Sequence, residues 1–168
     1  MKPTPAGWPR ISTALYFENA AKAIDWLCNA FGFEVRLKIE GEGGRIAHSE
    51  LVYGEGLIMV GEATKESRSD DASKSPAGDT SGKSPAGERM YRRSPRELGG
   101  ANTQSMMVYV DDVEAHCKRA REAGAKIVAE PKTTDYGEGY WTDRGYEAED
   151  LEGHHWFFYQ RLRDPVKK

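Results

Sequence analysis

The chain has 168 residues, of which 38% are hydrophobic, and a formal net charge of −3. This length suits one domain with a real core, and the weakly acidic balance gives no reason to expect nucleic acid or an anionic membrane as a partner. No run of 18 apolar residues is present, which argues against a membrane-spanning helix. The first nine residues lack the apolar core of a signal peptide, and Cys28 and Cys117 are too few for a disulfide framework, so we expect a cytoplasmic protein with buried, reduced thiols.

The first predicted elements lie between residues 10 and 63. An apolar strand around Leu15 is followed by a helix that begins after Asn19, a typical N-terminal cap, and ends at Gly32. Alternating apolar residues and glycine-containing turns then predict three strands, at residues 33–40, 45–53 and 57–62. The first module is therefore predicted to be βαβββ.

A polar insert follows the first module, and we place it at residues 64–100. Its hydrophobic residues up to position 89 are alanines only, and the sequence Lys-Ser-Pro-Ala-Gly occurs twice. Such a composition buries too little apolar surface to offset the entropy lost on ordering, so we expect a flexible loop. Its last part contains four arginines, which belong either to a solvated linker or to a flap that closes over a site or docks on a second subunit: Arg89, Arg92, Arg93 and Arg96.

The second module, residues 101–162, repeats the pattern of the first at an offset of about 93 residues. A strand around Val108 leads to a helix capped by Asp111 or Asp112, and Gly124 ends that helix. Strands are predicted near residues 125–130, 139–148 and 154–160. The sequence thus predicts an α+β fold in which two βαβββ modules form one domain over residues 1–168.

These modules resemble the glyoxalase, bleomycin-resistance and extradiol-dioxygenase superfamily, also called vicinal oxygen chelate proteins. The resemblance rests on the segments at residues 30–34 (Ala-Phe-Gly-Phe-Glu), 48–51 (His-Ser-Glu-Leu), 108–113 (Val-Tyr-Val-Asp-Asp-Val) and 150–157 (Asp-Leu-Glu-Gly-His-His-Trp-Phe). It implies curved mixed sheets around a ligand cavity, and a homodimer. In the enzymes of this family a divalent metal is held by side chains on the first and last strands of each module.

The four metal-ligand positions implied by the resemblance fall on Ser12, Glu50, Ser105 and Phe157. One carboxylate with two neutral hydroxyls is a poor donor set for a divalent ion, and phenylalanine offers no donor. A shift of the alignment by one residue on any of these strands restores no histidine. We therefore predict no metal site and no cofactor.

Counting in steps of two from these positions predicts which side chains line the cavity. The expected ligand-binding residues on the strands are aromatic or polar: Tyr16, Met107, Tyr109, His155, Phe157 and Tyr159. The opposite face is apolar enough to pack under helices: Leu15, Phe17, Leu51, Met106, Val108, Val110, Trp156 and Phe158. Two further ligand-binding candidates come from the segment before the closing strand, where Trp141 offers a ring for stacking and Arg144 a fork for a carboxylate or phosphate. Alternatively, Arg144 pairs with a nearby carboxylate on the surface.

His48 and Glu50 are the catalytic candidates, because residues two apart on a strand point the same way. They form either a base with an orienting carboxylate, or two donors of an unconventional metal site completed by His155, or locally paired side chains at a sheet rim. His154 is expected to be exposed or next to a turn and His116 to lie on the solvent side of a helix, both uninvolved in the site. The sequence shows no nucleophile elbow and no Cys–His pairing that would indicate covalent catalysis.

Three functions remain open at this point. The favoured one is a metal-free protein that binds a small aromatic or polar organic molecule in the cavity between the modules. The second is a superfamily enzyme of lyase or dioxygenase type, with an altered metal site or with His48 and Glu50 as acid and base. The third is a regulatory or scaffold module whose arginine-rich insert binds another protein.

Overall fold

The computed structural model describes residues 1–64 and 92–166. Its first half is one βαβββ module whose four strands form a mixed sheet in the order β1-β4-β3-β2. Strand β1 runs parallel to β4, and the other neighbours are antiparallel. The elements of this module are β1 (Thr13–Phe17), α1 (Ala20–Phe31), β2 (Glu34–Glu40), the short 3-10 helix η1 (Glu42–Gly44), β3 (Ile46–Tyr53) and β4 (Gly56–Glu62).

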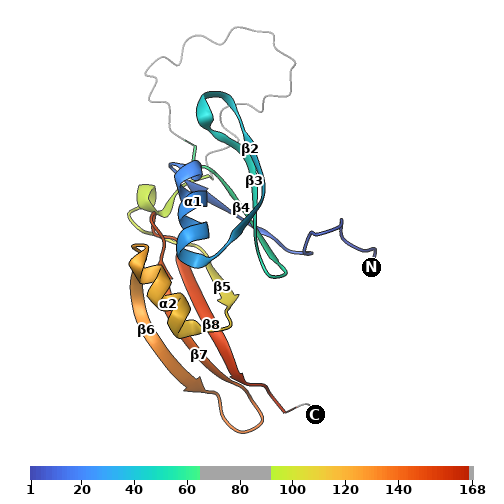
Figure 1. Cartoon of the computed structure of the whole chain (residues 1–168), viewed down its shortest axis with the longest axis vertical. Coiled ribbons are helices and arrows are strands. Elements are labelled where there is room, and N and C mark those ends of the chain that lie inside the picture. Colours follow the sequence, from blue (N-terminus) through green and yellow to red (C-terminus); the bar gives the residue numbers. More distant parts are fainter. Residues whose placement is uncertain (65–91, 167–168) are drawn as a thin grey trace.

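The second half repeats this topology in a sheet of order β5-β8-β7-β6, again with one parallel pair, β5 and β8. The two modules lie end to end along the long axis of the molecule, each helix packs on the sheet of its own module, and α1 and α2 neighbour each other on the same side (Figure 1). The predicted α+β fold of two βαβββ modules is thus confirmed. The elements of the second half are η3 (Pro95–Leu98), β5 (Ser105–Tyr109), α2 (Val113–Glu122), β6 (Lys126–Asp135), β7 (Thr142–Glu149) and β8 (His155–Arg163).

Both helices begin at the predicted caps. The Asn19 side chain accepts a hydrogen bond from the backbone N–H of Lys22, and that of Asp112 accepts from the N–H groups of Glu114 and Ala115. Helix α1 ends at Gly32, whose φ of 77° lies in the left-handed region that glycine adopts without strain. None of the helices in the described ranges is long and apolar enough to cross a membrane.

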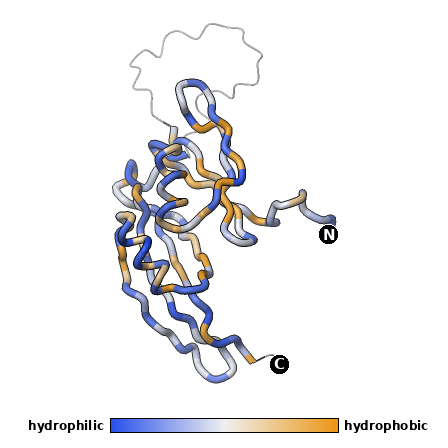
Figure 2. The backbone as a smooth tube through the Cα atoms, viewed as in Figure 1, coloured by the Kyte–Doolittle hydropathy of each residue, from blue (hydrophilic) through white to orange (hydrophobic). Residues whose placement is uncertain are grey.

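One face of each sheet packs against the helices and forms a continuous core. The side chains predicted for this face are buried, among them Leu15 and Phe17 on β1 and Trp156 and Phe158 on β8. Phe31, at the end of α1, joins the two halves, because its ring lies 5.2 Å from that of Trp156 and 4.7 Å from that of Phe158. Hydrophobic residues recur along strands such as β1, β4 and β5, whereas α2 and β7 are mostly hydrophilic (Figure 2).

His116, expected on the solvent side of α2, is in fact buried at the joint between the modules, with 5% of its surface exposed. Its Nδ1 accepts a hydrogen bond from the Tyr146 hydroxyl at 2.7 Å, and its Nε2 donates to the carbonyl of Phe31 at 3.0 Å. Two groups satisfy both ring nitrogens, so the imidazole is accommodated in the core as a neutral ring. Burial lowers the pKa of His116 to about 4.

His154, expected to be exposed or next to a turn, lies at the turn between β7 and β8 and is buried there. Asp150 organises this turn by accepting hydrogen bonds from the backbone N–H groups of Glu152 and His154, at 3.0 Å each, and from the Trp156 indole at 3.1 Å. The turn needs a buried acceptor for these three donors, and Asp150 supplies it. His154 Nδ1 also lies 3.1 Å from the Asp150 carboxylate, so both residues have a structural role in the turn.

The C-terminal part of the predicted insert is folded, contrary to the expectation of a flexible loop up to residue 100. Ser94 is fully buried, caps η3 and donates a hydrogen bond to the Glu152 carboxylate at 2.6 Å. The same carboxylate accepts from the backbone N–H of Glu18, so this segment ties both modules together. Residues 65–91, with the remainder of the predicted flap including Arg89, lie outside the described residues.

Candidate functional site

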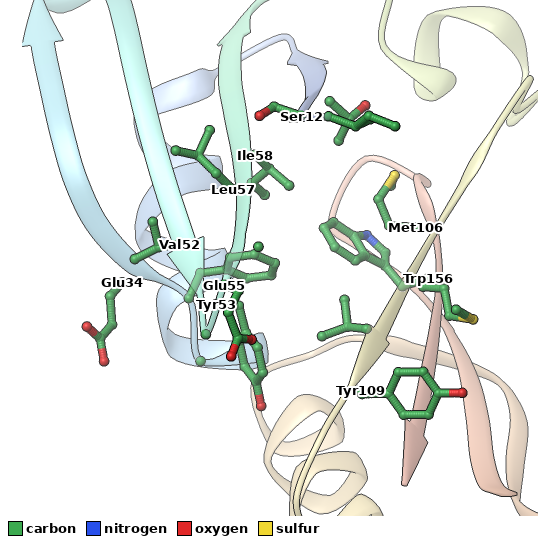
Figure 3. A pocket seen from close by; sticks show the side chains of 18 of the residues that line it. Ser12, Glu34, Val52, Tyr53, Glu55, Leu57, Ile58, Met106, Tyr109 and Trp156 are labelled. Atoms are coloured by element: carbon green, nitrogen blue, oxygen red, sulfur yellow. The ribbon is translucent and has the colours of Figure 1, made fainter. Parts of the chain in front are cut away.

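A groove of ≈1030 Å³ lies between the two modules. The start of β1 and the turn between β3 and β4 form one wall, and β5 forms the other (Figure 3). Its floor is apolar, which is typical of pockets that bind small organic molecules. The apolar side chains that line it include Phe33, Leu57, Ile58, Met106, Val108 and Trp156.

Polar and charged side chains also line this groove, among them Glu34 and Glu55, and one of them is a serine with an unpaired hydroxyl. The Oγ of Ser12 is buried and has no hydrogen-bond partner among residues 1–64 and 92–166. Leaving a buried hydroxyl unpaired costs about 1–3 kcal/mol, so a polar ligand atom placed here would recover that cost. Asp111, Arg119 and the hydroxyl-bearing rings of Tyr53 and Tyr109 supply further polar groups. Burial raises the pKa of Tyr53, which therefore stays a neutral phenol at pH 7.

Met107 and Tyr109, both predicted to bind ligand, line the groove from β5. They remain 61% and 44% exposed, which is unusual for a large apolar or aromatic side chain inside a strand. Both belong to what we call the open face, the side of the second sheet that carries the odd-numbered residues of β5, β7 and β8. The groove and the open face thus meet along β5.

The open face carries a row of aromatic side chains on β8. His155, Phe157 and Tyr159, all predicted to bind ligand, follow one another at steps of two, and the rings of Phe157 and Tyr159 are nearly parallel at 9°. The Tyr159 ring lies across the β7 backbone at Gly145, where a Cβ atom would stand 2.2 Å from its Cδ1. Gly145 therefore allows the ring to lie flat on the sheet, leaving its other side available for stacking.

A charged cluster closes one end of this aromatic row. Arg161 Nε donates a hydrogen bond to the buried carboxylate of Asp143 at 2.5 Å, and Arg161 Nη2 donates to the Tyr109 hydroxyl. The guanidinium also lies 5.2 Å from the centre of the Tyr109 ring and 5.7 Å from that of Trp141. Trp141 therefore borders the open face and does not line the groove, and its predicted role in ligand binding stays a prediction, whereas Asp143 and Arg161 were not anticipated.

Arg144 occupies the opposite face of β7, away from the aromatic row. Its Nε donates to Glu114 at the start of α2 at 2.6 Å, and its Nη1 donates to Thr133 at 3.2 Å. Of the two interpretations of this arginine, surface pairing is therefore the one that its contacts support, with a helix carboxylate as the partner. The sequence offered a signal for this placement. Arg144 is separated by two and four residues from Tyr146 and Ala148, which are buried against the helices, so all three side chains are on the same face of β7.

The first sheet brings together the two catalytic candidates. His48 Nε2 donates to Glu50 Oε1 at 3.0 Å, which leaves Nδ1 as an acceptor. Glu50 is buried, and Arg36 Nε lies 3.4 Å from its second oxygen. Tyr16 is placed apart from this group, under the guanidinium of Arg92, which lies 5.4 Å from its ring centre.

The residues present do not suit a divalent metal ion. Both oxygens of Glu50 are already engaged by His48 and Arg36, the Ser105 hydroxyl is bonded to His155, and Phe157 has no donor atom. Across the described ranges, no three side chains of His, Cys, Asp or Glu stand close enough to share one ion. A metal needs several free N or O donors at fixed geometry, and this arrangement does not provide them.

Another contact that sequence reasoning missed surrounds His155. The Ser105 hydroxyl donates to its Nδ1 at 3.3 Å, and a carboxylate oxygen of Glu147 lies 3.3 Å from its Nε2. These three residues come from three strands, and only the pairing of β5, β8 and β7 brings them together.

Relatives among curated proteins are uncharacterized mycobacterial proteins. One from Mycobacterium bovis is 28% identical over 156 residues, covering 93% of this chain and 86% of the relative. Another from Mycobacterium tuberculosis is also 28% identical, covering 93% of this chain and 76% of the relative.

Solved structures share the fold over most of the chain. TioX from Micromonospora sp. ML1 is 27% identical with a TM-score of 0.59, and the match covers 90% of this chain and 95% of TioX. TnmS3, an antibiotic binding protein from Streptomyces sp. CB03234, is 16% identical with a TM-score of 0.54, covering 89% and 93%. The family model described as Glyoxalase/Bleomycin resistance protein/Dioxygenase superfamily matches residues 11–158. Two βαβββ modules around an apolar groove, together with this match, place the chain in the glyoxalase/bleomycin resistance protein/dioxygenase superfamily.

Proposed function

We propose that the protein binds a small organic molecule with an aromatic part, in the groove between the modules and on the adjoining open face. The observation that carries this proposal is the combination of a groove of ≈1030 Å³ that has an apolar floor with two exposed side chains, Met107 and Tyr109, on the strand that borders it. TnmS3, which shares the fold, is an antibiotic binding protein, so this architecture accommodates such ligands elsewhere.

The contacts of the groove suggest how the ligand is held. Apolar parts of the ligand would cover Met107 and the floor of the groove, and a planar ring would stack on Tyr159, which Gly145 holds flat. The unpaired hydroxyl of Ser12 would bond a polar atom of the ligand. We propose that binding uses no metal, because the donor set around Glu50 is already engaged.

We further propose a homodimer. In a single chain the open face exposes Met107 on β5, and the first sheet exposes Leu37 and Ile39 on β2. Burial of such surface against a second copy would be favourable, and it would enclose the ligand more fully.

Both cysteines are free thiols, which fits the expected reducing cytoplasm.

Fluorescence titration with Nile red, a neutral planar aromatic dye, tests the proposed ligand site. We expect saturable binding that Tyr109→Ala weakens by roughly tenfold, since a lost aromatic contact is worth about 0.5–1.5 kcal/mol beyond its buried area. The control is Leu162→Ala, because Leu162 is 49% exposed on β8 but belongs to the opposite face. Equal affinities of both variants for Nile red would contradict the proposed site. A separate metal analysis of the purified protein tests the metal-free proposal, which stoichiometric zinc, nickel, manganese or iron would contradict.

The second candidate function is acid–base catalysis by His48, with Glu50 as the orienting group. The hydrogen bond of 3.0 Å between them favours it, because that bond fixes the tautomer with Nδ1 as the base. If a turnover is found, His48→Ala should lower it by about 10²–10⁴-fold. An unchanged rate in His48→Ala would exclude this mechanism.

A further inference from the structure

We propose that Ser105, His155 and Glu147 form a hydrolytic site on the open face, in which Ser105 is the nucleophile for activated carboxylic esters. This inference goes beyond ligand binding and does not require the bound ligand to be the substrate. It starts from two distances, 3.3 Å between the Ser105 Oγ and His155 Nδ1 and 3.3 Å between His155 Nε2 and a Glu147 carboxylate oxygen. A nucleophile, a base and a carboxylate that orients the base are the parts that activated-serine catalysis needs.

Strand pairing determines this arrangement. Ser105 and His155 are direct neighbours across the parallel pair β5 and β8. His155 pairs with Glu149 on β7, so Glu147, two residues earlier, points to the same side of the sheet. All three side chains therefore share the open face, on rigid strands in place of mobile loops.

The first module offers an internal comparison, because it has the same serine without the base. Ser12 is the counterpart of Ser105, and continuing the register of Thr13 with Ile58 by one residue places Leu57 beside it. Glu50 occupies the position that corresponds to Glu147. The two copies of the module thus differ at the histidine, and only the second has serine, histidine and glutamate in contact.

The surroundings of the serine suit reaction with a substrate. Ser105 is exposed, and the Phe157 ring packs edge-on against the His155 ring at 4.9 Å and 80°, which restricts its rotation. In the described part of the chain, β5 is an edge strand whose only neighbour in the sheet is β8. The backbone N–H of Val110, just after β5, donates to the carbonyl of Tyr159 on β8. Because N–H groups alternate in direction along a strand, those of the even-numbered residues of β5 point to β8 and those of the odd-numbered residues point away from it. The backbone N–H of Ser105 therefore points away from β8, and we assign it as the donor to the acyl oxygen of the tetrahedral intermediate.

The chemistry is a two-step ester hydrolysis. Ser105 Oγ attacks the acyl carbon while its proton passes to His155 Nδ1, and the bond from the acyl carbon to the leaving oxygen breaks as that oxygen takes the proton from His155. Water then attacks the acyl carbon, gives a proton to His155, and Ser105 Oγ leaves and recovers it. The net reaction converts an ester and water into an acid and an alcohol, and Glu147 acts as a positioning residue throughout.

The test uses the full chain with a fluorophosphonate probe, which labels activated serines, and with p-nitrophenyl butyrate as the ester. We expect one label, mapped to Ser105 by peptide mass spectrometry, and ester hydrolysis that Ser105→Ala abolishes and His155→Gln lowers by about 10²-fold or more. Thr103→Ala, which removes an exposed hydroxyl two residues before Ser105, is the control and should keep both labelling and rate.

Glu147→Gln tests the positioning role. We expect a lower kcat with an unchanged KM and an unchanged melting temperature, and partial recovery in Glu147→Asp, a pattern that loss of folding would not produce. Absence of labelling, a label on another residue, or hydrolysis that survives Ser105→Ala would overturn the proposal. Because labelling needs no Nile red site, the failure of this proposal and the failure of the binding proposal are seen separately.

Discussion

Acidification should loosen the joint between the modules, because the buried His116 resists protonation. Its ring is fixed between the hydroxyl of Tyr146 and the carbonyl of Phe31, and burial lowers its pKa to about 4 from an ordinary value of 6.5. Arg119 on the same helix further disfavours the charged ring, whereas the carbonyl of Phe31 favours it. Tyr53, whose ring centre lies 6.5 Å away on β3, is neutral in this range.

The sign and size of the effect follow from linkage. Between pH 6.5 and 4 the unfolded chain binds a proton at this histidine and the folded chain does not, so the free energy of unfolding falls as the pH falls. The full contribution is present above pH 6.5. One pKa unit corresponds to 1.36 kcal/mol, so a shift from 6.5 to about 4 removes about 3 kcal/mol by pH 4.

Urea unfolding at a series of pH values, for the wild type and for His116→Gln, measures this contribution. Glutamine keeps a donor for Phe31 and an acceptor for Tyr146 but does not titrate, so the difference between the two proteins isolates the histidine. We expect the wild type to lose about 3 kcal/mol more than the variant between pH 7 and pH 4. Parallel pH dependence of the two proteins would refute the assignment of a neutral buried His116.

Two further predictions concern positions where the packing is unusually exacting. Gly145→Ala should displace the Tyr159 ring, destabilise the protein by about 1–3 kcal/mol and weaken Nile red binding. Gly61→Ala, whose added Cβ makes only ordinary contact at 3.6 Å, should change neither the urea midpoint nor Nile red affinity, and equal effects of the two would contradict this reasoning. Ser94→Ala should cost about 1–3 kcal/mol in urea unfolding, because it removes a helix cap and leaves the buried Glu152 with one donor fewer; an unchanged midpoint would contradict it.

The topology and the two faces of each sheet were predictable because they follow from local patterns. The helix caps at Asn19 and Asp112 and the alternation that buries Trp156 and leaves its neighbours half-buried act over a few residues, and the repeat shows the same local patterns twice. The capping pattern from Ser94 to Glu97 was also readable, and it would have shortened the predicted flexible insert.

Contacts between distant strands could not be read from the chain. His116 looks like a solvent-facing residue until Tyr146 and the carbonyl of Phe31, 30 and 85 residues away, satisfy its ring. The grouping of Ser105 with His155 likewise depends on the parallel register of β5 with β8, which no local pattern specifies. From sequence alone a polar side chain is expected to face solvent. A tertiary hydrogen-bond partner allows the same side chain to be buried, and that partner is not visible in the local sequence.

NMR mapping of Nile red on the isotope-labelled chain of 18.7 kDa tests the central claim, a ligand site at the groove between the modules. We predict that amide shifts at saturation cluster at residues 11–13 and 53–56 on one wall of the groove and at residues 106–109 on the other, and extend along β8 from His155 to Tyr159. Shifts confined to the outer surface of α2, or scattered over both modules without saturation, would contradict the account.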